Sequence, residues 1–103
     1  MDALIKKNIP KIHQLCKIHG VESLSLFGSA AKNELTKQSD VDFLVRFSSS
    51  IALLDYADNY FNLLEKLKNL FKRKVDLVSE KSLKNPILIK EINDTKVSLY
   101  NEQ

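Results

Sequence analysis

Cysteine occurs only once in this chain, as Cys16, so the 103 residues cannot form an internal disulfide. The sequence also contains no apolar run long enough to cross a bilayer and no recognisable secretory leader. A reducing, cytoplasmic location is therefore expected, with no membrane as a partner. In that setting Cys16, which has apolar neighbours, is interpreted as a small core residue.

Aromatic side chains make up only 8% of the residues, and they do not form the stacking pattern of a protein that binds single-stranded nucleic acid. The net charge of +3 is mildly basic, and the charges alternate in sign over much of the chain. Nucleic acid is therefore not the favoured partner. The only histidines, His13 and His19, are six residues apart and not three or four, so we expect structural roles for them and no zinc site.

Hydrophobic residues occupy 44% of the positions, which is enough for one core, and we expect a single domain over residues 1–103. The apolar spacing alternates between helical and strand periods. It predicts a first helix with Asn8 as a candidate cap, strands at 22–27, 40–47, 74–78 and 97–100, and helices at 29–32 and 53–71. A last helix is predicted to open at Asn85-Pro86, with Asn85 as its cap and Pro86 in its first turn. This order is typical of an α/β (α+β) fold in which helices pack on a mixed sheet of about four strands.

The helix predicted over residues 53–71 is amphipathic. Its expected buried stripe consists of Leu53, Ala57, Tyr60, Phe61, Leu64, Leu67 and Phe71. A compact basic run of Lys72, Arg73 and Lys74 follows directly. Two interpretations stay open for this run. It attracts a triphosphate or an acidic protein, or it is a solvated helix end whose cations complement the helix dipole.

Two carboxylates, Asp40 and Asp42, begin the strand predicted for 40–47. Side chains alternate faces along a strand, so both should project from one face, about 7 Å apart. A third acid, Asp76, interrupts the apolar run 75–78, although Asp is disfavoured within strands. If the two strands are neighbours, three carboxylates converge, and a bound cation is the usual reason to tolerate such like charges. The sequence therefore predicts a site for Mg²⁺, with two ions expected.

A bend at Gly28-Ser29 precedes these acids. Gly28 permits a sharp turn and a close approach of the backbone to a ligand. The short helix that follows would offer its first N–H groups, beside the Ser29 hydroxyl, to phosphate oxygens. Lys32, one turn in, would add a positive charge. Gly28, Ser29 and Lys32 are therefore predicted to bind the phosphates of a nucleotide.

Taken together, these features resemble the signature of the minimal nucleotidyltransferases (MNT), small members of the DNA polymerase beta-like superfamily. The resemblance covers nearly the whole chain. Its parts are the Gly28-Ser29 bend, the ten residues that separate it from Asp40, the segment Ser39 to Val45, and the segment Val75 to Val78.

The resemblance implies a nucleotidyltransferase fold and a catalytic, metal-ligating role for Asp40, Asp42 and Asp76. Asp76 would help to activate the attacking hydroxyl. ATP or another nucleoside triphosphate would be the substrate, held by Gly28 and Ser29. The family also implies a partner, a HEPN-domain toxin, toward which the MNT protein acts as antitoxin by transferring AMP from ATP to a tyrosine hydroxyl.

Two positions depart from the family pattern, which commonly has Arg and then Gly where this chain has Lys32 and Asn33. Lysine lacks the bidentate fork of arginine, and Asn adopts a left-handed backbone less readily than Gly. These departures keep open a second hypothesis, a non-catalytic antitoxin that inhibits its HEPN partner by stoichiometric binding. A third, transfer to a small molecule such as an aminoglycoside, would need a pocket between the subunits of a homo-oligomer.

Each feature alone has a plainer explanation. Gly28-Ser29 would be an ordinary turn, Asp40 and Asp42 could cap or flank the start of a strand, and Asp76 could pair with a nearby cation. Their joint occurrence in the right order favours a nucleotidyltransferase site.

Overall fold

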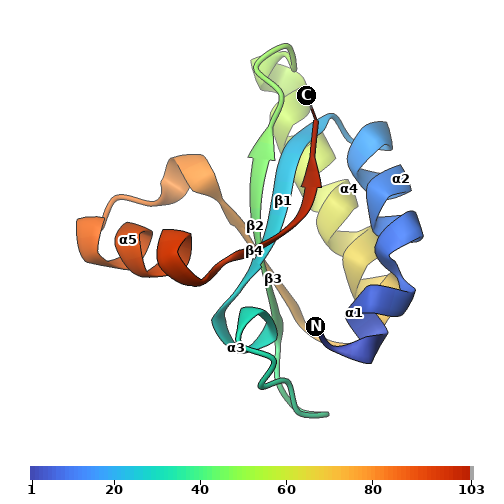
Figure 1. The fold of residues 1–103 in the computed structure, drawn as a ribbon. Coiled ribbons are helices and arrows are strands. Elements are labelled where there is room, and N and C mark those ends of the chain that lie inside the picture. Colours follow the sequence, from blue (N-terminus) through green and yellow to red (C-terminus); the bar gives the residue numbers. More distant parts are fainter. Residues whose placement is uncertain (103) are drawn as a thin grey trace.

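A four-stranded mixed sheet forms the centre of the protein in a computed structural model that describes residues 1–102 (Figure 1). The strand order is β3-β2-β1-β4, and β1 runs antiparallel to both β2 and β4, whereas β2 and β3 are parallel. The elements are α1 (Ala3–Lys7), α2 (Ile9–Ile18), β1 (Val21–Phe27), α3 (Gly28–Ala31), β2 (Val41–Phe47), α4 (Leu53–Phe71), β3 (Val75–Ser79), the 3₁₀ turn η1 (Glu80–Ser82), α5 (Pro86–Thr95) and β4 (Val97–Asn101). The predicted α/β (α+β) fold with a mixed sheet is confirmed.

The helices divide between the two faces of the sheet. α1, α2 and α4 lie along one face, and α3 and α5 lie on the other side (Figure 1). Two parallel strands cannot be joined by a tight turn, and the 19 residues of α4 provide the crossover from β2 to β3. Alternation along β2 then sends Val41, Phe43 and Val45 into the core and leaves Asp42 and Arg46 on the face of α3.

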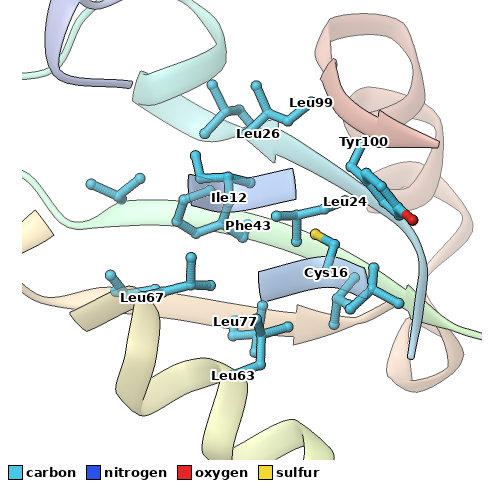
Figure 2. Packing of buried hydrophobic residues seen from close by; sticks show 14 of the residues in the cluster. Ile12, Cys16, Leu24, Leu26, Phe43, Leu63, Leu67, Leu77, Leu99 and Tyr100 are labelled. Atoms are coloured by element: carbon cyan, nitrogen blue, oxygen red, sulfur yellow. The ribbon is translucent and has the colours of Figure 1, made fainter. Parts of the chain in front are cut away.

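The hydrophobic core lies between the sheet and the helices α1, α2 and α4 (Figure 2). Its fully buried members include Ile12, Leu24, Phe43 and Leu63. Cys16 is also fully buried, as predicted for a small core residue, and its burial raises the pKa of the thiol to about 12. Within residues 1–102, no helix combines the length and the apolar character that a membrane crossing requires.

Asn8 divides the N-terminal region into two helices. It ends α1 and precedes α2, and Pro10 is accommodated in the first turn of α2. The position agrees with the predicted cap, but the side-chain Nδ2 donates to the carbonyl of Leu4 at 2.8 Å and makes no capping bond to α2.

The two histidines have structural roles. His13 Nε2 lies 2.7 Å from the carbonyl of Leu99, and Nδ1 of His19, just after α2, lies 2.8 Å from the carbonyl of Leu15.

The predicted buried stripe of α4 is partly wrong. Leu53 and Phe61 are 89% and 63% exposed, whereas Leu63, which was not in the stripe, is fully buried. α4 contains adjacent apolar residues at 53–54, 60–61 and 63–64. Two neighbouring faces of the helix are therefore similarly apolar, and either could form the buried stripe. Packing against the sheet selects the phase that carries Leu63, Leu67 and Phe71.

β3 is an edge strand, and α4 reaches over its rim. The hydroxyl of Tyr60 donates to the carbonyl of Leu77, and the hydroxyls of Tyr56 and Ser79 are hydrogen-bonded to each other. These contacts join the middle of α4 to the strand that carries Asp76.

Candidate functional site

Asp42 and Asp76 lie directly opposite each other on neighbouring strands. The parallel pairing of β2 and β3 aligns Asp42 with Asp76, and the pairing of β1 with β2 places Phe27 opposite Asp42 on the other side. Residues in register on adjacent strands point to the same face of a sheet. Both carboxylates therefore lie on the face of α3, next to the residue at which the chain bends out of β1.

The bend at Gly28 presses against the carboxylate of Asp42. Gly28 has φ of +64°, a left-handed conformation, and a Cβ placed on it would lie 2.5 Å from Oδ2 of Asp42 and 3.4 Å from Cγ. No side chain fits in that space without moving Asp42. The bend thus faces the acidic pair, as the phosphate-binding prediction requires.

The electrostatics at Asp42 favour a cation. Burial first, and then the charges of Asp76 and Asp40, raise the pKa of Asp42 above its ordinary 3.8. Carboxylate oxygens are the ligands that Mg²⁺ prefers, and the carboxylate of Asp42 lies directly against the backbone of Gly28. The chemistry of Asp42 and Asp76 therefore fits a divalent cation. Yet in residues 1–102 no three His, Cys, Asp or Glu side chains are grouped so that they could hold a metal ion.

Asp40 lies outside the strand in which it was predicted. β2 begins at Val41, and Asp40 is exposed at the end of the loop that joins α3 to β2. The predicted strand thus begins one residue too early, and a shared face for Asp40 and Asp42 stays a prediction. The position of Asp40 depends on the loop, whose contacts are described below.

The predicted phosphate-binding residues belong to the four-residue helix α3 or follow it directly. Ser29 is half-buried at its second position, and Lys32 is exposed at its C-terminal end. So short a helix has a small dipole, so any phosphate binding here would depend on local N–H groups and hydroxyls. Asn33 adopts φ of +59°, a left-handed backbone conformation that Asn tolerates better than most residues.

The basic run after α4 contains residues in different roles. Lys72 ends α4 in a left-handed conformation with φ of +53°, and its side chain and that of Lys74 are exposed. The guanidinium of Arg73, by contrast, donates to the carbonyl of Thr36 in the loop that carries Asp40. The helix-end interpretation therefore describes Lys72, and Arg73 has a contact that the sequence did not indicate.

Two further residues, Tyr60 and Arg46, were not among the predicted site residues. The hydroxyl of Tyr60 donates to the carbonyl of Leu77, the residue after Asp76, and burial and then the charge of Asp76 raise the pKa of that hydroxyl. Arg46 lies on the same face of β2 as Asp42 and forms ion pairs with Glu22 at 3.3 Å and Glu80 at 3.6 Å. The alternation of residues 42, 44 and 46 could have indicated Arg46, whereas Tyr60 was placed in the expected buried stripe of α4.

Comparison with known protein families gives one match that spans most of the chain. The family described as polymerase beta, nucleotidyltransferase matches residues 10–103. One relative is a Methanocaldococcus jannaschii protein that is named a protein adenylyltransferase. It is 39% identical over 90 residues, which are 85% of this chain and 88% of the relative.

Solved structures agree with this match. A structure described as a minimal nucleotidyltransferase has a TM-score of 0.71 and 32% identity, and the match covers 94% of this chain and 95% of that one. A Shewanella oneidensis complex of a tri-AMPylated HEPN toxin with an MNT antitoxin contains a chain with a TM-score of 0.64. The match to that chain has 21% identity and covers 94% of this chain and 72% of that one, and it is a likeness of fold.

Proposed function

Because this chain belongs to the polymerase beta nucleotidyltransferase family, we propose that it transfers a nucleoside monophosphate from a nucleoside triphosphate to a hydroxyl group. The proposed donor is ATP, the transferred group is AMP, and the proposed acceptor is a tyrosine of a HEPN-domain toxin, which makes this protein an antitoxin. The name of the archaeal relative supports the chemistry, and the AMPylated HEPN complex supports the partner.

The observation that carries the proposal is the alignment of Asp42 with Asp76 beside the Gly28 bend. In the proposed reaction the acceptor oxygen attacks the α-phosphorus, a new P–O bond forms, and pyrophosphate leaves. Asp76, on the edge strand, is the proposed acceptor of the hydroxyl proton. The bend at Gly28 and Ser29, with Lys32, is proposed to retain the β- and γ-phosphates.

Asp42 and Asp76, completed by Asp40, are the residues that would hold Mg²⁺. Two such ions, when bound, supply positive charge that stabilises the entering and leaving oxygens of an in-line displacement. The carboxylates themselves hold substrate and cation on a rigid sheet, because Asp42 and Asp76 both belong to paired strands. The raised pKa of Asp42 is consistent with a site that binds cations to offset its clustered charge.

The test is to incubate the purified HEPN-domain partner with this protein, ATP and Mg²⁺, and to weigh the partner by mass spectrometry. We expect a mass increase of one or more AMP groups, which Asp42→Asn should abolish. Asp58→Asn, an exposed position on α4, is the matched control and should leave the transfer intact. No added nucleotide with the wild-type protein, or equal labelling by Asp42→Asn, would contradict the proposal.

A second candidate is stoichiometric inhibition of the HEPN partner without catalysis. The replacement of the usual Arg-Gly by Lys32 and Asn33 favours it, because lysine binds phosphate without a bidentate fork. Titration of the toxin without nucleotide separates the two functions. Full neutralisation at one-to-one by the Asp42→Asn protein would support masking, whereas neutralisation that requires ATP supports transfer.

A further inference from the structure

Two tethers hold the segment that carries Asp40. On one side, the amide of Val41 donates to the carbonyl of Lys74 at 3.1 Å. On the other side, Nη2 of Arg73 donates to the carbonyl of Thr36. Both tethers come from consecutive residues just ahead of β3, so the loop is attached to the strand that supplies the third acid of the proposed site.

The tether from Arg73 ends on a closed turn. The amide of Ser39 donates to the carbonyl of Thr36 at 3.2 Å, and the two side-chain oxygens lie 2.9 Å apart. The amide of Thr36 also donates to Oγ of Ser39 at 3.1 Å, and the amide of Gln38 bonds Oγ1 of Thr36 at 3.3 Å. A turn linked in this way moves as one piece. Because Ser39 directly precedes Asp40, the anchor on Thr36 also limits where Asp40 can lie.

Arg73 differs from the lysines beside it. It forms no ion pair with the acids of residues 1–102, and its Nε is buried without a hydrogen-bond partner. Because no acid pairs with Arg73, attraction to a neighbouring carboxylate does not explain the placement of this side chain. Its buried Nε–H without a partner also costs free energy. The side chains of Lys72 and Lys74 are exposed.

We propose that Arg73 is a positioning residue for Asp40, and that its bond to Thr36 limits how far Asp40 can move from Asp42 and Asp76, with which it would hold Mg²⁺. The effect on Mg²⁺ binding rests on the proposed function, whereas the contact between Arg73 and the loop does not depend on it. Asp40 directly precedes Val41, the first residue of β2 that pairs with β3, so a displacement of the loop moves Asp40 relative to Asp42 and Asp76.

The experiment compares Arg73→Gln with Lys74→Gln. Each removes one positive charge from the same basic run, but only the first removes the bond to Thr36. Hydrogen exchange at the amides of Ser39 and Val41 should become about tenfold faster in Arg73→Gln and stay unchanged in Lys74→Gln. The Mg²⁺ concentration for half-maximal transfer should rise about tenfold or more in Arg73→Gln only. Arg73→Lys, which keeps a single donor, should recover part of both effects.

Three results would overturn the proposal: unchanged exchange in Arg73→Gln, faster exchange with an unchanged Mg²⁺ dependence, or an equal Mg²⁺ shift in Lys74→Gln. A rise in the KM for ATP alone would instead mean that Arg73 contacts the triphosphate. If the wild-type protein transfers no nucleotide, the proposed function fails by itself. Calorimetric titration of Mg²⁺ in the presence of AMP-PNP then decides, and equal affinities of the two variants would overturn the role of Arg73.

Discussion

Gly28 and Asp42 are in such close contact that the backbone of one determines the position of the other. Gly28→Ala should cost about 1–2 kcal/mol from the left-handed backbone alone. It should also displace the carboxylate of Asp42 and reduce nucleotide transfer by about 100-fold. Urea unfolding and the transfer assay measure the two effects separately.

Gly20→Ala is the matched control for this substitution. Gly20 has φ of +69°, and a Cβ there would lie 2.4 Å from Cδ1 of Ile51, so the strain is similar but falls on an apolar side chain. We expect a comparable loss of stability with transfer retained per folded molecule. If both variants keep wild-type transfer, the close approach of Gly28 to Asp42 has no part in the reaction.

The raised pKa of Asp42 has a consequence for stability. When the folded-state pKa of an acid is raised, ionisation destabilises the fold as pH rises through that pKa. In EDTA near neutral pH, Asp42→Asn should therefore raise the free energy of unfolding relative to wild type. Below 3.8, where the carboxyl is neutral in both states, this advantage should disappear.

Urea unfolding at both pH values tests this expectation, with Asp58→Asn as the exposed comparison. The Asp42→Asn protein should be more stable than wild type and at the same time inactive in transfer. A stability gain that is the same at both pH values would show that ionisation of Asp42 is not its cause.

At the scale of single elements, α5 depends on the residue that caps its N-terminus. Oδ1 of Asn85 accepts from the amides of Ile87 at 2.9 Å and Leu88 at 3.4 Å, as the Asn-Pro pair predicted. Asn85→Ala should lower the free energy of unfolding by about 1 kcal/mol, because helix N–H groups lose their acceptor.

Circular dichroism during urea unfolding measures that loss. Asn93→Ala, at an exposed position inside the same helix, should change stability by only a few tenths of a kcal/mol, since alanine is the better helix former. Equal effects of the two substitutions would mean that the cap contributes nothing to α5.

The strands and the acidic pair could be predicted because their signals are local. Asp42 and Asp76 interrupt apolar runs of period two, and the register that aligns them follows once β2 and β3 are neighbours. The phase of α4 could not be predicted, because its adjacent apolar residues permit two stripes. The loop before Asp40 could not be predicted either, since the bond from Arg73 to Thr36 joins residues 37 positions apart.

At the scale of the whole molecule, Cys16 reports on global unfolding. The thiol is fully buried and its pKa is about 12, so almost no thiolate exists in the native protein near neutral pH. Modification by a thiol reagent should be slow in buffer and should accelerate through the same urea range in which circular dichroism records unfolding.

A cysteine at an exposed position, Ser49→Cys in a Cys16→Ala background, should react at once without urea. Rapid modification of Cys16 in the native wild-type protein would mean that the core around α2 opens locally, without unfolding of the sheet.

The contact of Tyr60 with the rim of β3 also affects how separate copies of the protein meet. An edge strand offers unpaired backbone groups on which a strand from another molecule can add, and such pairing is a common start of aggregation. The phenolic hydroxyl already uses the Leu77 carbonyl, in the middle of that rim. One backbone acceptor of this edge, beside the acidic pair, is thus already used within the molecule, which disfavours the addition of a strand from another copy at that point.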